Sequence, residues 1–335
     1  MHPSESIFVA GHNGLVGSAL LRSLGQAGYP NLLFRSHSEL DLEDADVVRE
    51  FFSRHPPRHV FLAAARVGGI LANQREPAEF IRRNLRIQTN VIHECWRSGV
   101  ERLLFLGSSC IYPRLAPQPV GEESLMSGPL ESTNRAYAVA KIAGIEMCRA
   151  YNRQYGTRFL AAMPANLYGP GDNYHPANSH LIPALIWKMH QAKIEGANEV
   201  VLWGSGTPRR EFLHADDAAA ACLALMNLPP DAFAELADGN PAAPLINLGS
   251  GEDMTVRELA ELVAEVVGVK PRLAFDAARP DGTPRKLLDS SRLRALGWRP
   301  RIGLREGLQQ TYADFCRRAS GSAAGGPFKP VPCAS

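Results

Sequence analysis

The chain has 335 residues, of which 45% are hydrophobic and 21% are charged, with 36 Lys and Arg against 34 Asp and Glu. This composition is close to the globular average, which excludes disordered, collagen-like and disulfide-scaffold proteins. The length predicts about two domains, each able to bury a core. The net charge of +2 gives no reason to expect nucleic acid or an anionic membrane as a partner.

The cysteines form no Cys-x-x-Cys pair, so neither a metal site nor a disulfide framework is expected. They stand at positions 95, 110, 148, 222, 316 and 333. The N-terminus lacks the basic and apolar regions of a signal peptide, and no apolar run reaches the roughly 18 residues that a membrane span needs. We therefore expect a soluble, cytoplasmic protein with reduced thiols.

The first half of the chain alternates short apolar runs with segments of helical length. The runs predicted to be strands are 7–10, 31–34, 59–64, 102–106 and 158–163. The segments predicted to be helices are 15–28, 44–54, 78–98 and 134–155. This alternation implies right-handed crossovers between parallel strands, with helices on both faces of the sheet. The predicted fold is therefore α/β, with a doubly wound parallel sheet of the Rossmann type.

The second half is less regular. It contains predicted helices at 179–195, 216–226 and 256–267, and predicted strands at 200–203, 245–248 and 272–275. We predict a dinucleotide-binding domain over 1–165, to which about 214–248 returns, and a smaller α/β substrate domain mainly over 166–318. Residues 319–335, rich in Gly, Pro and Ala and carrying Cys333, are predicted to be a disordered tail.

A glycine-rich turn follows the first predicted strand and opens the first predicted helix. Gly11, Gly14 and Gly17 are spaced Gly-x-x-Gly-x-x-Gly. Such glycines let the backbone approach a pyrophosphate, which the free N–H groups at the helix N-terminus bind. The same cluster elsewhere is often a plain structural turn, but its place at this junction favours dinucleotide binding. Arg35, at the end of the second strand, favours the 2′-phosphate of NADP, although it also fits a solvated strand-end charge.

A phenol and an ammonium stand four residues apart in one predicted helix, at Tyr137 and Lys141. They share a face, about 6 Å apart along the axis, and the ammonium is expected to lower the phenol pKa. Alone this spacing is a common coincidence. It gains weight from Ser108, which follows the fourth strand at the sheet edge where ligands bind and where a hydroxyl can hydrogen-bond a carbonyl oxygen.

The Ser/Tyr/Lys set after such a glycine turn resembles the extended short-chain dehydrogenase/reductase superfamily. Further motifs resemble its GDP-L-fucose synthase family, from about residue 7 to 316. They lie at 106–113, 140–144, 166–170, 175–180, 203–206, 210–214 and 280–289. The resemblance implies NADPH-dependent conversion of GDP-4-keto-6-deoxy-D-mannose to GDP-L-fucose by 3,5-epimerisation and 4-reduction, with a homodimer as the expected assembly.

The resemblance also implies residue roles. Cys110 is the expected base and His180 the expected acid of epimerisation, since both groups titrate near neutral pH. Tyr137 is expected to protonate the C4 alkoxide, with Lys141 on the cofactor ribose and Ser108 orienting the ketone. Read alone, a cysteine at a strand end is more often a small buried hydrophobe, and a lone histidine more often a satisfied structural residue.

Two sets of binding residues follow from the same resemblance. The expected cofactor-binding residues are Gly11, Gly14, Leu15, Val16, Gly17, Arg35, Asp41, Leu42, Ala63, Lys141, Pro164, Asn166, Leu167 and His180. The expected nucleotide-sugar residues are Asn166, Lys188, Trp203, Arg210 and Lys286. The cations suit a diphosphate, although each residue also fits a surface charge or a core aromatic. No metal is expected.

The chain departs from the family pattern at positions where that pattern has arginine. Asn13 and His37 replace arginines near the 2′-phosphate, which leaves Arg35 as its main cation and NAD(H) as an alternative cofactor. Lys188 keeps its charge but loses the bidentate guanidinium. Alternative functions are reduction of a related GDP-4-keto sugar of 6-deoxy-heptose or colitose metabolism, UDP-hexose 4-epimerisation, and NADP sensing without chemistry. Cys110 and His180 disfavour the UDP-hexose reaction, and the intact Ser/Tyr/Lys set disfavours sensing.

Overall fold

A parallel sheet of strands that are mostly buried along their whole length forms the centre of the larger lobe. The computed structural model describes residues 1–175, 179–240, 242–279 and 281–321. Six strands pair in the order β2-β1-β3-β4-β5-β9. Their bounds are Ile7–Ala10 (β1), Leu32–Leu33 (β2), His59–Leu62 (β3), Arg102–Leu106 (β4), Phe159–Pro164 (β5) and Leu245–Leu248 (β9). Helices shield both faces, as continuous apolar strands require.

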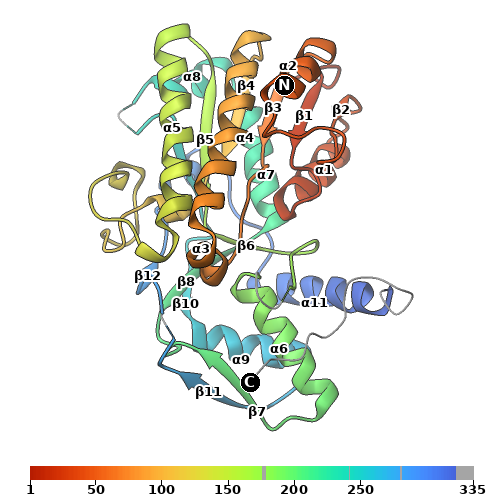
Figure 1. The fold of residues 1–335 in the computed structure, drawn as a ribbon, viewed down its shortest axis with the longest axis vertical. Coiled ribbons are helices and arrows are strands. Elements are labelled where there is room, and N and C mark those ends of the chain that lie inside the picture. Colours follow the sequence, from red (N-terminus) through yellow and green to blue (C-terminus); the bar gives the residue numbers. More distant parts are fainter. Residues whose placement is uncertain (176–178, 241, 280, 322–335) are drawn as a thin grey trace.

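The helices of this lobe form two layers. On one face, α4 packs between α2 and α5; on the other, α1 packs against α7 (Figure 1). The bounds are Leu15–Gln26 (α1), Ala45–Arg54 (α2), Ile70–Arg75 (α3), Pro77–Arg97 (α4), Arg135–Tyr155 (α5), Ala215–Met226 (α7), Pro230–Asp238 (α8) and Ser291–Ala295 (α10). Short 3₁₀ turns span Ser109–Ile111, Glu122–Ser124 and Ser132–Asn134.

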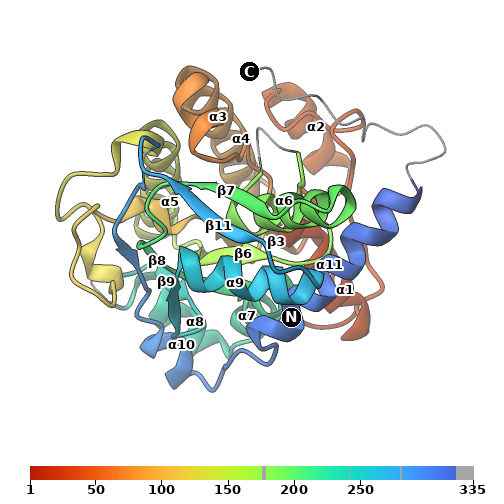
Figure 2. The same ribbon diagram turned by 90° about the horizontal axis from the view of Figure 1, so that it is seen from below.

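A second hydrophobic cluster lies in the smaller lobe. It joins α6 (Leu181–Glu195), α9 (Val256–Val267) and α11 (Leu304–Gly321) to a parallel pair, β7 (Glu199–Trp203) and β11 (Arg272–Asp276). The view from below shows these elements lying together (Figure 2). Because each lobe buries its own apolar side chains, the surface between the lobes can carry polar groups.

A small sheet of four short strands lies where the lobes meet. Its central strand β8 (Arg209–His214) pairs in parallel with β6 (Asn166–Tyr168) and β12 (Arg285–Lys286) and antiparallel with β10 (Asp253–Thr255). Motifs from three distant parts of the sequence therefore meet at one place.

The predicted doubly wound α/β fold is confirmed, and the predicted elements of the first half fall within a few residues of the observed ones. The strands of the junction sheet, together with α3, α8 and α10, were not predicted, and most of them are too short to show a period. The predicted tail is wrong at its start, since α11 continues to Gly321 and Ser320 Oγ bonds the Cys316 carbonyl. The rest of that tail, with Cys333, lies outside the described residues. In the part of the chain that the structure describes, no helix has the length and apolar content to cross a membrane.

The turn between β1 and α1 depends on two glycines. A Cβ at Gly17 would lie 2.0 Å from the Gly11 carbonyl oxygen and 2.7 Å from the His12 Cα. Gly11 has a φ of +87°, and a Cβ there would lie 2.6 Å from the Ala64 nitrogen. All of these neighbours are backbone atoms, so no side-chain movement can relieve the clash.

Gly17→Ala is expected to lower the free energy of unfolding by about 1–3 kcal/mol, because the added methyl group must displace this backbone. Gly25→Ala in the same helix is the matched control, since a Cβ there meets nothing within 4 Å. The control should be neutral or stabilising by up to about 1 kcal/mol through helix propensity. Thermal melts of both variants check the prediction; equal melting temperatures would contradict it.

Candidate active site

The first part of the site is the N-terminus of α1. Gly14 is its N-cap and offers no side-chain hydrogen bond, so the first N–H groups of the helix keep no side-chain partner there. The turn lies at the point where the strand order passes from β1 to β3, which is where doubly wound sheets bind ligands. Leu15 and Val16 begin the helix, and Ala63 lies against Gly11 just beyond β3. This uncapped turn, with its close glycine backbone, fits a dinucleotide pyrophosphate.

The predicted 2′-phosphate region follows β2. The half-buried Arg35 donates to the Phe34 carbonyl at 2.7 Å and packs over the Phe51 ring. Asp41 accepts the Glu43 amide, and the Leu42 carbonyl accepts from Asn90. These loop contacts fix the backbone beside the glycine turn.

His12 and Glu39 belong to this region, and the sequence reasoning did not select either of them. The His12 ring lies 5.0 Å from that of Phe34, and its buried Nδ1 has no hydrogen-bond partner. Glu39 accepts both the amide and the hydroxyl of Ser36. The sequence offered one signal for His12, namely its position between Gly11 and Gly14 in the glycine turn.

The structure brings Ser108, Cys110, Tyr137 and Lys141 together beyond the end of β4. The Ser108 hydroxyl hydrogen-bonds the Tyr137 phenol and the Cys110 thiol, and it caps the short turn by accepting the Cys110 amide at 3.5 Å. Lys141 is buried on α5 and donates to the Leu106 carbonyl at 2.8 Å. Two predicted residues of α5 therefore lie beside two predicted residues that follow β4.

The expected lowering of the Tyr137 pKa by the Lys141 ammonium is not observed. Burial raises the pKa of Tyr137 well above its ordinary value, and the hydrogen bond from Ser108 offsets only part of that effect. Lys141 does not counter the rise, because its ammonium is directed at a carbonyl and burial lowers its own pKa to about 8. Tyr137 is therefore a protonated phenol at neutral pH, which is the state that a proton donor requires.

Cys110 lines a pocket with residues from both lobes. Burial raises the pKa of its thiol, while the ammonium groups of Lys286 and Lys141 and a hydrogen bond from Ser108 lower it. Glu131, a pocket residue that the sequence reasoning missed, is 8% exposed. Its carboxylate accepts from Thr133 and pairs with Arg114. The thiol therefore lies in a mainly cationic environment that opposes the cost of forming a thiolate.

His180 directly precedes α6, and Lys188 lies in the middle of that helix. His180 is the N-cap residue and makes no side-chain capping bond. The residue is exposed, and desolvation of the imidazole lowers its pKa. Lys188 donates to the Val201 carbonyl at 2.7 Å. The contact of Ser179 with Gly69 places the start of α6 beside the larger lobe.

The junction sheet collects the remaining predicted substrate residues. Lys286 is the direct partner of Arg210 in the β12–β8 pairing, and Asn166 on β6 donates to the Glu211 carbonyl at 2.7 Å. Pro164 ends β5, and Leu167 follows Asn166 in β6. Trp203 ends β7, is 51% exposed, and has the Arg279 guanidinium 4.9 Å from its ring centroid. Two cations and one amide thus face a common region at the lobe junction.

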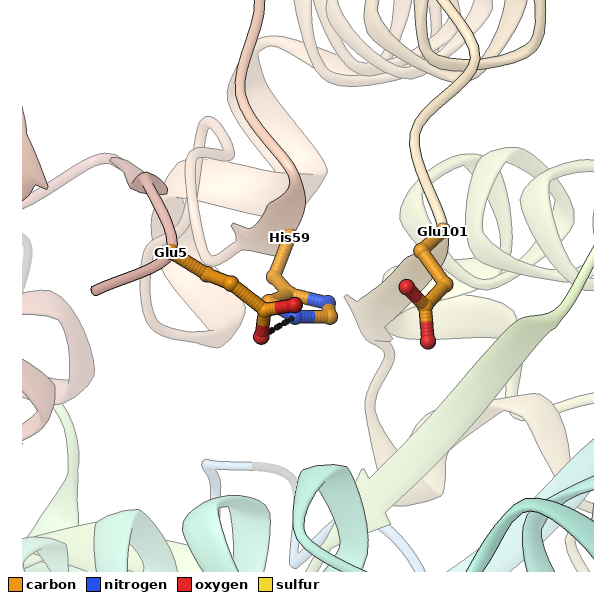
Figure 3. A group of neighbouring side chains, drawn as sticks. All are labelled: Glu5, His59 and Glu101. Carbon is orange, nitrogen blue, oxygen red and sulfur yellow. Dashed lines mark hydrogen bonds and ion pairs between the residues drawn. The ribbon is translucent and has the colours of Figure 1, made fainter. Parts of the chain in front are cut away.

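A separate group of ligand-type side chains lies at the opposite ends of the strands of the large sheet, where β1, β3 and β4 begin. Glu5, His59 and Glu101 place their ligand atoms within 4.8 Å of one another, with His59 between the two carboxylates (Figure 3). Arg58 forms ion pairs with both carboxylates, and His59 Nε2 contacts Glu5 at 2.9 Å. Because protein cations already neutralise these carboxylates, we interpret the group as an ion-pair network rather than a metal centre.

The comparisons with known proteins agree with this geometry. Residues 7–234 match the model of the NAD-dependent epimerase/dehydratase family. The chain belongs to this family. Within the family it is grouped with the GDP-L-fucose synthases, which confirms the resemblance: it is 55% identical to GDP-L-fucose synthase 1 of Arabidopsis thaliana, with 92% of each chain covered. It is 53% identical to GDP-L-fucose synthase of Escherichia coli K12, over 93% of this chain and 96% of that one.

A solved structure in the same family shares the whole fold. It is a GDP-mannoheptose C4 reductase from Campylobacter jejuni with NADP bound. The TM-score is 0.85 at 36% identity, and the alignment covers 94% of this chain and 99% of that one. A nicotinamide cofactor and a GDP-sugar substrate class are therefore supported for this member of the epimerase/dehydratase family.

The ion-pair network predicts an acid-dependent loss of stability. Burial would raise the pKa of Glu5, but hydrogen bonds from the His2 amide and from His59 bring it down to about 2. A depressed carboxyl pKa stabilises the fold above the unfolded value of about 4.3 and loses that effect as the pH falls toward 2. Glu5→Gln should therefore cost about 1–2 kcal/mol at pH 7, after allowance for partial exposure, and progressively less as the pH falls toward 3.

Urea melts at several pH values measure this difference. Glu79→Gln is the control, because Glu79 forms a surface ion pair with Arg82 and should change nothing measurable. A constant difference between wild type and Glu5→Gln across the pH range would contradict the prediction.

Proposed function

We propose that this protein converts GDP-4-keto-6-deoxy-D-mannose to GDP-L-fucose by 3,5-epimerisation and 4-reduction, with NADPH as the preferred cofactor. The observation that carries the proposal is the position of the Cys110 thiol, which lies in one pocket with Lys286 and is hydrogen-bonded to the Ser108 of the Ser/Tyr/Lys group. A reductase alone needs no thiol at that place. The high identity to GDP-L-fucose synthases along nearly the whole chain supports the same reaction.

The epimerisation requires removal and return of protons at C3 and C5, which the C4 carbonyl makes acidic. Cys110 accepts a proton as the thiolate, and its negative charge is favoured by Lys286 and Lys141. His180, on the facing element α6, returns a proton on the opposite side of the sugar. Its lowered pKa makes the protonated imidazole a stronger acid than usual.

The reduction uses the remaining groups. When bound, the nicotinamide supplies hydride to C4 of the sugar. Ser108 donates a hydrogen bond to the ketone oxygen, and Tyr137 transfers its phenolic proton to the alkoxide that forms. Lys141 is expected to hold the cofactor ribose. One pocket thus serves both steps, and the intermediate need not leave.

The cations of the junction sheet are proposed to hold the diphosphate of the nucleotide sugar. Arg210 and Lys286 lie side by side on paired strands, and Lys188 and Trp203 lie further along the smaller lobe. A diphosphate carries about two negative charges, which suits a pair of adjacent cations. Asn166 contributes an amide to the same region.

The preference for NADPH rests on Arg35, which lies next to the glycine turn. Asn13 and His37 supply no permanent positive charge there, so slower use of NADH is compatible with the site. The NADP-bound reductase of the same family supports the phosphorylated cofactor.

We also propose a homodimer formed through α4 and α5. These helices pack along the outside of the larger lobe and carry an aromatic cluster that includes the stacked rings of Trp96 and Tyr155, with centroids 4.3 Å apart. Tyr155 and Val139 remain 44% and 38% exposed. Light scattering after gel filtration tests the assembly.

The decisive experiment follows NADPH oxidation by the purified protein with GDP-4-keto-6-deoxy-D-mannose, with NADH in parallel. GDP-L-fucose as the product would support the reaction, and the two rates would give the cofactor preference. No oxidation of either cofactor would overturn the proposal and favour another GDP-4-keto sugar, such as a heptose derivative.

Cys110→Ser is expected to reduce deuterium incorporation from solvent at C3 and C5 by at least about a hundredfold, because a hydroxyl is a far weaker base. Binding of NADPH should be unchanged. Mass spectrometry of the recovered sugar nucleotide measures the exchange. Normal exchange in this variant would refute the role of the thiol.

Tyr137→Phe is expected to show the opposite pattern. Reduction should fall by about a hundredfold or more, since the alkoxide loses its proton donor, whereas deuterium exchange at C3 and C5 should continue. The two variants therefore serve as controls for each other. Unimpaired NADPH oxidation in Tyr137→Phe would show that another group supplies the proton.

A further inference from the structure

Glu211 is a fully buried carboxylate that none of the proposed chemical steps uses. It lies on β8, directly after Arg210. Among the residues that the structure describes, none forms an ion pair with it, and burial raises its pKa to about 7 while hydrogen bonds from the Gly251 and Leu288 amides lower it. Burying a carboxylate without a counter-ion is costly, so its hydrogen bonds must hold something that the fold needs.

The hydrogen bonds of Glu211 join two distant segments to β8. Oε1 accepts the Gly251 amide at 2.7 Å and Oε2 accepts the Leu288 amide at 2.9 Å. Ser250 Oγ adds a weaker bond at 3.4 Å. The turn before β10 and the segment after β12 are therefore held by one side chain.

Two of the contacts of Glu211 lie next to proposed substrate residues. Leu288 stands two residues after Lys286, which pairs with Arg210 across the β12–β8 register. The backbone carbonyl of Glu211 accepts the Asn166 side chain at 2.7 Å. The other side of the β12 segment is held separately, since the Leu287 amide donates to Gln118 Oε1. β12 has only two residues, so its pairing with β8 supplies few hydrogen bonds of its own.

We propose that Glu211 is the positioning residue of the nucleotide-sugar site: by clamping the segment after β12 onto β8, it holds Lys286 beside Arg210 at the spacing that a diphosphate requires. This inference rests on the proposed function, because it takes these cations as the diphosphate-binding groups. Glu211 itself does not touch the substrate.

Glu211→Gln tests the proposal with little change in shape. The amide oxygen can still accept one backbone N–H, but the amide NH₂ must face the other, so one buried hydrogen bond is replaced by two opposed donors. The KM for the GDP-keto sugar and the Kd for GDP itself should both rise about tenfold, as expected for the loss of one buried hydrogen bond. The kcat at saturation and the Kd for NADPH should stay within about twofold, because the Ser108–Tyr137 group and the glycine turn lie on other elements.

Asp217→Asn is the matched control. Asp217 is 4% exposed and accepts the amides of Arg301 and Ile302, so the same change removes the same type of bond elsewhere. This variant should lose thermal stability without a change in KM or in the Kd for GDP. Ser250→Ala, which removes the weakest bond to Glu211, should give a smaller rise in both constants and remains informative if Glu211→Gln folds poorly.

The outcomes separate the two proposals. The positioning role is overturned if Glu211→Gln and Ser250→Ala leave the Kd for GDP unchanged. It is also overturned if kcat and the affinity for NADPH fall by as much as the affinity for GDP. If the wild-type protein binds GDP, and Glu211→Gln weakens that binding, but no GDP-L-fucose forms, the positioning role stands and the proposed reaction fails. Calorimetric titration with GDP needs no turnover and therefore distinguishes these cases.

Discussion

The site depends on the pairing of β8 with three other strands at the lobe junction. Parallel pairing fixes which residues lie opposite each other, and a shift of one residue would turn every side chain to the other face. The observed register sets Lys286 beside Arg210 and Asn166 beside Phe212. These strands are only two to six residues long, so side-chain hydrogen bonds such as those of Glu211 must supply much of what holds the register.

The same strand links the substrate groups to the cofactor lobe. β8 ends at His214, whose side chain caps α7 by accepting the Asp216 amide. Asp216 in turn forms an ion pair with Arg22 of α1, the helix whose N-terminus faces the proposed pyrophosphate. A continuous set of contacts therefore connects the two binding regions, which fits a reaction that needs both ligands in one geometry.

The sequence predicted the large sheet well, because its strands are continuous apolar runs and its helices are long enough to show a clear period. It also predicted Ser108, Tyr137 and Lys141 as one group, since the carboxyl ends of parallel strands meet at one edge. The junction sheet was not predicted, because three of its strands have only two or three residues and so no pattern of their own, and the longer β8 begins with three charged residues. Glu131 and Glu211 were missed for a related reason: nothing in the local sequence distinguishes a buried glutamate from an exposed one.

Burial is the main cause of every pKa shift in the catalytic group, and it always favours the uncharged form. It raises the pKa of the Cys110 thiol and lowers the pKa of the Lys141 and Lys286 ammoniums and of the His180 imidazole. For the expected base and acid of epimerisation, the two pKa values move apart, because the thiol pKa rises from a value already above that of the imidazole, whose pKa falls. The thiolate is then a stronger base, and the protonated imidazole a stronger acid, than either would be in water. Each charged form is correspondingly more costly to populate, and the ammonium groups of Lys286 and Lys141 reduce that cost for the thiolate.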